Sequence, residues 1–138
     1  MAAAFNKFQS FVEILGLGDH HLDAAGDTFK CYLTNNVPDT AADNNKADLA
    51  TATEEHGYTA EDVQNDYTET AGTGTMTCVD ITITAAGGTV GPFQYVPMYN
   101  DTHASDALVC WWDYGSEITL ADGESFTIDF GASTLSIA

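Results

Sequence analysis

The sequence predicts an all-β protein: a single-domain antiparallel β-sandwich or barrel with a short N-terminal helix. Two observations carry this prediction. Short segments that alternate apolar and polar residues recur along the chain, separated by turn-forming Gly, Asn and Asp residues, and they indicate about seven or eight strands. The chain has 138 residues and no internal repeat, so its length favours one domain with a core of its own.

The N-terminal unit, residues 1–18, is predicted to be a helix followed by a turn. Over residues 4–15, large apolar side chains recur at helical spacing: Phe5, Phe8, Phe11, Val12 and Leu15. Gly16 and Gly18 then end the helix. This apolar stripe must be buried, and the sequence leaves open whether it packs on the sandwich of its own chain or on a neighbouring subunit.

The predicted β-sandwich, residues 28–138, opens with a strand at 28–34 that places Phe29, Cys31 and Leu33 on one face. A long acidic loop at 35–66 follows, and loops of that length are commonly functional or partly disordered. Within the loop, residues 47–53 fit a short strand or a turn of helix, and residues 59–63 fit a further short element.

The later strands are expected from β-branched and alternating segments. They are 75–84 with Val79, Ile81 and Ile83 inward, 89–99 after a turn at Gly87 and Gly88, 117–120, 125–130 with Phe126, Ile128 and Phe130 on one face, and 133–137.

The stretch from Gly91 to Gly115 is predicted to be the central hairpin, because two alternating segments flank a polar connection at 100–107. It holds both tryptophans. Since Trp111 and Trp112 are adjacent, a regular strand sends them to opposite faces, so one of them is expected to point away from the core. The alternative is a sandwich covered on both sides, in which both are buried.

The charge of the chain excludes several partners. There are 21 acidic residues against 3 lysines and no arginine, which gives a formal charge of −18. Nucleic acids and anionic membranes attract basic surfaces, so neither is expected as a partner. Salt screens such self-repulsion, so a marine or halophilic setting is the simplest interpretation. Solubility of an abundant protein, or a less acidic partner surface, would explain the charge equally well.

The sequence contains no recognisable pattern of catalytic or metal-ligating residues, so no enzyme, cofactor or metal site is expected. The three cysteines, Cys31, Cys78 and Cys110, form no CxxC pair and are interpreted as small buried hydrophobes. His56 and His103 stand isolated in polar stretches and are interpreted as solvated loop residues. The opening MAAAF lacks the features of a signal peptide, and we expect the protein to be made and kept soluble.

Three blocks of the sequence resemble a family of small virion structural proteins of tailed bacteriophages. The blocks are AAFNKFQSFVEILGLGDHHLDAAGDTFKCYLTN, GPFQYVPMYNDT, and WWDYGSEITLADGESFTIDF followed by TLSIA. The resemblance covers the N-terminal and C-terminal thirds of the chain and fades over residues 39–73. It implies a component of the phage particle that is assembled in the host cytoplasm.

Within that family, the size and β-rich build resemble head decoration, or cement, proteins that bind outside the capsid. This implies the major capsid protein and further copies of the chain as partners. The candidate interface residues are Phe5, Phe8, Phe11, Leu15, Trp111 and Trp112. Two alternatives stay open: a tail component such as a tube, terminator or fibre-base protein, and a carbohydrate-binding module that uses Trp111, Trp112 and Tyr114 as a stacking platform.

Overall fold

The computed structural model describes residues 3–138, so positions 1 and 2 of the predicted N-terminal unit lie outside it. The predicted all-β fold with one short N-terminal α-helix is confirmed. The strands are β1 (Phe5–Lys7), β2 (Phe29–Cys31), β3 (Glu61–Asp62), β4 (Asp66–Thr70), β5 (Thr73–Thr77), β6 (Ile81–Thr84), β7 (Val90–Asn100), β8 (Leu108–Leu120), β9 (Ser125–Ile128) and β10 (Leu135–Ile137). The helices are α1 (Gln9–Gly16) and the 3₁₀ helix η1 (Lys46–Asp48).

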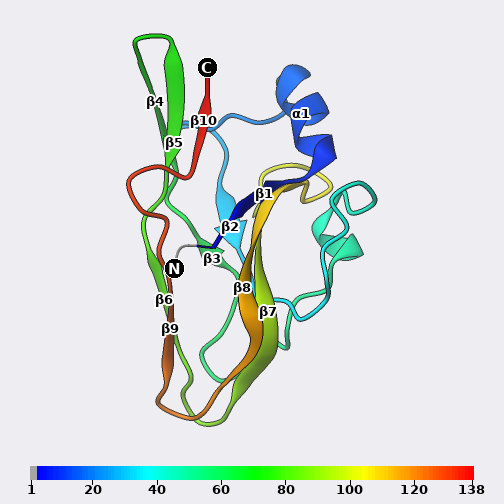
Figure 1. The fold of residues 1–138 in the computed structure, drawn as a ribbon, viewed down its shortest axis with the longest axis vertical. Helices are drawn as coiled ribbons and strands as arrows, with labels where there is room; N and C mark the ends of the chain where they lie inside the picture. The colour runs from blue at the N-terminus through cyan, green and yellow to red at the C-terminus, as the bar shows by residue number, and fades with distance from the viewer. Residues whose placement is uncertain (1–2) are drawn as a thin grey trace.

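The strands form two layers with the core between them (Figure 1). One layer is a five-stranded antiparallel sheet in the order β1-β8-β7-β2-β3. The other consists of two smaller sheets, β10-β5-β4 and β6-β9, that follow each other along the long axis of the molecule. Because β5 leads directly into β6, and β9 leads on to β10, the same two stretches of chain build both small sheets.

The predicted central hairpin is confirmed as β7 and β8, the two longest strands. Their register pairs Val96 with Trp112 and Met98 with Cys110. The side-chain oxygen of Asn100 accepts the backbone N–H groups of Thr102 and His103, at 3.0 and 3.2 Å, and so fixes the turn after β7. β8 is longer than predicted, since it also includes the segment 117–120 that was expected as a separate strand.

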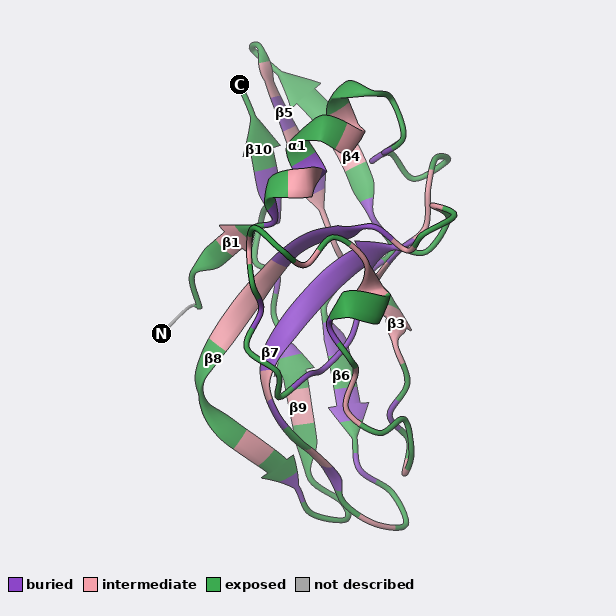
Figure 2. Cartoon of the chain, turned by 90° about the vertical axis from the view of Figure 1, so that its right-hand side faces the viewer, coloured by how far each residue is buried: buried purple, intermediate pink, exposed green. Residues whose placement is uncertain are grey.

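Both faces of the middle of the five-stranded sheet are buried, as the purple β7 in Figure 2 shows. The long loop at 35–66 covers one of these two faces. Its apolar side chains Leu49, Tyr58 and Val63 are all buried in the core. The Tyr58 hydroxyl accepts the backbone N–H of Leu33 at 2.7 Å, and the Tyr32 hydroxyl donates to the Leu49 carbonyl at 2.8 Å. The acidic loop is therefore a structural layer of this domain.

The predicted helix over residues 4–15 is wrong at its start. Residues 5–7 form β1, which pairs with β8 so that Phe5 lies opposite Trp112. Helical spacing did not distinguish this strand, because Phe5 lies on β1 and Phe8 lies between β1 and α1, so the apolar spacing ran across an element boundary. The end of the helix is as predicted: the N–H of Gly18, at φ +80°, donates to Leu15 O, and that of Asp19 donates to Ile14 O.

The predicted strand 75–84 is two strands, β5 and β6, and Val79 between them is exposed rather than inward. Here the Asp80 carboxylate accepts the backbone N–H of Phe130 at 3.0 Å, which interrupts the alternation. β6 then pairs with β9, so the Gly87–Gly88 turn does not close a hairpin with β7. Ile81 and Ile83 are buried as predicted.

Candidate interaction surface

Four aromatic side chains line one border of the five-stranded sheet, where it faces β9. We call this set the aromatic edge: Phe5 on β1, Trp112 and Tyr114 on β8, and Phe126 on β9. Phe5 and Trp112 make an edge-to-face contact with ring centroids 5.9 Å apart, and Tyr114 and Phe126 make another at 5.6 Å. Phe5 is 40% exposed and Tyr114 is 56% exposed. The outermost rings of a packed aromatic cluster thus reach the solvent.

The inner members of this cluster connect it to the core. Trp112 packs edge-to-face on Phe130 at 5.7 Å, and Phe126 packs on the buried Phe93 at 5.0 Å. Aromatic pairs favour edge-to-face arrangements of this kind. The exposed rings of Phe5 and Tyr114 are therefore backed by rings that pack on the core.

A large bulge in β8 begins after Asp113 and includes Tyr114. The register pairs Tyr95 with Asp113 and then Phe93 with Ile118, so residues 114–117 face Gln94 alone. Figure 2 shows the second half of β8 bowing away from β7. Asp113 holds the bulge, since its carboxylate oxygen accepts both the Gln94 side-chain amide at 2.9 Å and the Gly115 backbone N–H at 2.7 Å.

The structure brings together only two of the six predicted interface residues, Phe5 and Trp112. Trp111 lies on the opposite face of β8, where it packs on Tyr95 with centroids 5.9 Å apart. The two tryptophans lie on opposite faces as predicted, and both are half-buried, so neither is fully enclosed in the core. Because Trp111 and Trp112 lie on opposite faces, Trp111, Trp112 and Tyr114 do not form one stacking platform.

The other predicted interface residues belong to the core of this chain. Phe8 is fully buried and Phe11 is 4% exposed, so an interface role does not fit either side chain. Leu15 is half-buried against the same core. Tyr114 was considered from the sequence only as part of a sugar-stacking platform, although it shares its parity with Trp112 and so lies on the same face; the half-buried Phe126 was not considered as an interface residue.

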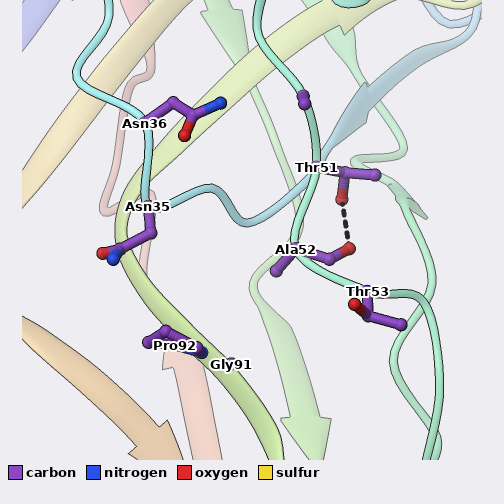
Figure 3. Close-up of a pocket in the computed structure, with 8 residues that line it drawn as sticks. Asn35, Asn36, Thr51, Ala52, Thr53, Gly91 and Pro92 are labelled. Carbon is purple, nitrogen blue, oxygen red and sulfur yellow. Dashed lines mark hydrogen bonds between the residues drawn. The ribbon is translucent and has the colours of Figure 1, made fainter.

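Two shallow hollows offer little chemistry. Figure 3 shows the first, of about 290 Å³, lined by residues 35–36, 50–53 and 91–92. Its side chains are amides, hydroxyls and small apolar groups, and the Thr51 hydroxyl donates to the Ala52 carbonyl at 3.0 Å. The second, of about 340 Å³, is lined by Asp19, His21, Asp27, Thr102, His103 and Ala104. Within residues 3–138, no three His, Cys, Asp or Glu side chains are placed to hold a metal ion.

The cysteines are free, and Cys31 and Cys110 are buried as predicted, whereas Cys78 is half-buried. Burial raises the pKa of the Cys31 and Cys110 thiols well above their usual value, and it raises that of Cys78 to about 11. All three thiols are therefore protonated near neutral pH, and a protonated thiol is a poor nucleophile.

Comparison with known proteins gives no relative: no protein family, curated protein or solved structure matches this chain. Among residues 3–138, no helix combines the length and apolar character needed to cross a bilayer. The aromatic edge is thus the feature of the described surface on which a functional argument can be built.

Proposed function

We propose that this chain is a non-enzymatic structural protein of a tailed-phage virion, a decoration protein that binds the outer surface of the head through its aromatic edge. The observation that carries the proposal is the aromatic edge, whose rings Phe5 and Tyr114 are exposed, on a strongly acidic chain. The resemblance of the sequence to phage virion proteins supports the same assignment, and its blocks include all four residues of the aromatic edge.

The aromatic edge has the build of an interface centre. Aromatic side chains in desolvated pockets supply most of the binding energy of typical interfaces, and each buries about 150–250 Å² when fully covered. The supporting rings of Trp112 and Phe126 pack on Phe130 and Phe93, so the exposed rings stand on an already packed base.

The charge of −18 restricts the partner. A second strongly acidic surface would be repelled, so the surface that takes the aromatic edge is neutral or basic there, in this proposal part of the major capsid protein. One aromatic edge makes a small contact. A decoration protein gains further affinity because it is held at several points of a repeating lattice.

The first test is a cryo-EM map of the particle that carries this chain. Density for the domain on the outer head surface, with the aromatic edge against the capsid lattice, is the expected result. Density confined to the tail would replace the decoration proposal by a tail component. Absence from the particle would contradict both virion assignments.

The second test measures incorporation into particles for the double variant Phe5→Ser/Tyr114→Ser. Its matched control is Leu17→Ser/Val37→Ser, which removes two exposed apolar side chains, 68% and 72% exposed, outside the aromatic edge. We expect the first variant to be incorporated at least about tenfold less, a loss of about 1.4 kcal/mol, and the control to match wild type. Melting curves of both purified variants check that they fold. Equal incorporation of the two folded variants would contradict the proposed contact.

A further inference from the structure

The connection between α1 and β2, residues 17–28, is joined to the turn after β7 by a buried polar cluster. Asn100 is fully buried and His20 is 5% exposed. The side-chain nitrogen Nδ2 of Asn100 lies 2.9 Å from His20 Nδ1 and 2.7 Å from Asp27 Oδ2. We call His20, Asp27 and Asn100 the histidine joint. It links two segments that are 80 residues apart in the sequence.

The imidazole of His20 also contacts two buried phenylalanines, one from each neighbouring element. It stacks on Phe11 of α1 with ring centroids 5.3 Å apart, and it packs at a tilt on Phe29 of β2 at 5.7 Å. Both phenylalanines belong to the core. The ring is thus part of the contact between α1 and the five-stranded sheet, and α1 loses this contact if His20 leaves the joint.

The joint fits a neutral imidazole and not a protonated one. Asn100 Oδ1 accepts the backbone N–H groups of Thr102 and His103, so the amide cannot turn over without losing both hydrogen bonds. Its Nδ2 therefore donates, and the facing Nδ1 of His20 accepts. A proton on Nδ1 would place two donors 2.9 Å apart. The other ring nitrogen, Nε2, is buried and has no hydrogen-bond partner within residues 3–138, so no acceptor there stabilises a charged ring.

Four titratable groups face His20. Asp19, His21 and Asp27 belong to the same connection and His103 to the β7–β8 turn, while α1 and β2 present phenylalanine rings. Burial has the largest effect and lowers the pKa of His20, His103 lowers it further, and Asp27 and Asp19 oppose both, so that the pKa is about 4. The second of the two hollows borders the joint, since Asp27 and His103 line it, and solvent therefore lies beside the cluster.

We propose that the histidine joint is an acid-sensitive latch that, when His20 takes up a proton, releases α1 and residues 17–21 from β2 and from the β7–β8 turn. The rest of the connection stays in place, because the Asn65 side chain donates to the carbonyl groups of Leu22 and Asp27, at 2.9 and 3.2 Å, and an amide does not titrate. At the other end, β1 stays paired with β8. The opening is therefore local, and it exposes the inner side of α1.

The pH sets the fraction of opened molecules. In the opened form the imidazole of His20 is free, with a pKa near 6.5, so this form binds the proton first as the pH falls. The latch is therefore fully closed above about pH 6.5. With a pKa of about 4 in the closed form, the ratio of opened to closed molecules rises about 70-fold between pH 7.5 and 4.5. The latch is a property of the isolated chain and does not depend on the proposed function.

Hydrogen exchange of the full chain, followed by NMR as protection factors at pH 7.5 and 4.5, tests the latch. The backbone N–H groups of Leu17, Gly18 and Asp19 close the end of α1. We expect their protection to fall about 70-fold toward pH 4.5. Low concentrations of urea should leave their exchange unchanged, because a local opening exposes little surface. The amides of β7 and β8 should be more strongly protected at both pH values.

Two variants and one direct titration separate His20 from its neighbours. His20→Leu removes the titrating group and should abolish the fall in protection. The control His21→Gln removes the adjacent histidine, whose side chain is 61% exposed, and should retain the fall. In the wild-type protein, an NMR titration of the His20 ring should give a pKa below about 5.

Three results would overturn the latch. The first is a wild-type His20 that titrates near pH 6.5 in the folded chain, which needs no variant and decides the matter even if His20→Leu does not fold. The second is an equal fall in protection in wild type and a folded His20→Leu. The third is equal protection of the α1 amides and the β7–β8 amides at pH 4.5, because the opening would then be global.

Discussion

His20 is buried beside two hydrogen-bonded polar groups, an environment that keeps its imidazole neutral. The side-chain oxygen Oδ1 of Asn100 accepts two backbone N–H groups. This orients the side-chain amide so that its Nδ2 faces His20 Nδ1 at 2.9 Å and Asp27 Oδ2 at 2.7 Å. Nδ1 is therefore the acceptor. The ring is stacked on Phe11, and within residues 3–138 His20 Nε2 has no hydrogen-bond partner.

Burial, and then the nearby His103, lower the pKa of His20 to about 4, although Asp27 and Asp19 act in the opposite direction. The unfolded chain, with a pKa near 6.5, binds a proton first, so stability is complete above about pH 6.5 and is lost as the pH falls toward 4. The shift corresponds to about 3 kcal/mol.

We therefore expect His20→Leu to flatten the pH dependence of the free energy of unfolding between pH 7.5 and 4.5, as measured by urea titration. The matched control is His56→Gln, which removes a half-buried histidine from a loop. The same pH dependence in wild type and His20→Leu would refute the role given to His20, even if the variant is less stable at every pH.

At the scale of elements, α1 is held by its inner face. Phe8 precedes the helix and is fully buried, Phe11 is nearly so, and the Phe8 backbone N–H donates to the Val109 carbonyl at 3.1 Å. Val12 on the outer face is 54% exposed. The N-terminal segment is thus packed into the domain through one side, as an intramolecular cover for the five-stranded sheet.

Truncation of Phe8 should accordingly cost far more than truncation of Val12. Phe8→Ala is expected to lower the free energy of unfolding by about 3–5 kcal/mol, because it leaves a cavity in the core. Val12→Ala, the control from α1, should change it by less than about 0.5 kcal/mol. Chemical denaturation of both variants makes the comparison, and similar losses would show that α1 is not anchored as described.

Secondary-structure elements that depend on a local sequence pattern were predicted correctly. The hairpin of β7 and β8, and the end of α1 at Gly16, follow from alternation and glycine placement. That Phe5 lies on a strand could not be predicted from local spacing, because β1 is defined by its pairing with β8, where Trp112 lies opposite Phe5. Burial of His20 depends likewise on Asn100. The aromatic edge was predicted in part: the alternation of Trp112 and Tyr114 is local, whereas the pairing of Phe5 with Trp112 and the bulge after Asp113 arise from strand register, which no local pattern encodes.

At the scale of the whole molecule, the acidic charge is largely uncompensated. Lys30 pairs with Asp101 at 3.1 Å, and Lys46 lies 4.0 Å from Glu54 and over the Tyr99 ring. With 21 acidic residues against 3 lysines, most carboxylates have no opposite charge to pair with. Their mutual repulsion opposes the compact state.

Monovalent salt should therefore stabilise the isolated protein. Between about 0.05 and 1 M NaCl, the screening length falls to about 3 Å, and we expect the melting temperature to rise by at least about 5 °C. KCl at the same ionic strength is the control and should act equally, since screening does not distinguish the two cations. A melting temperature that is independent of ionic strength would contradict this explanation.

The pairing of β1 with β8 also determines when the domain can close during synthesis. The Asn6 side chain reaches the Trp111 carbonyl, 105 residues further along the chain. At ribosomal rates of about 5–20 residues per second, the first strand waits roughly 5–20 s for its partner. Phe8 and Phe11 have no sheet to cover during that interval. Nascent chains on one polysome would then be kept apart by the repulsion between their carboxylates. The acidity that destabilises the finished domain would in this way be useful before the domain has folded.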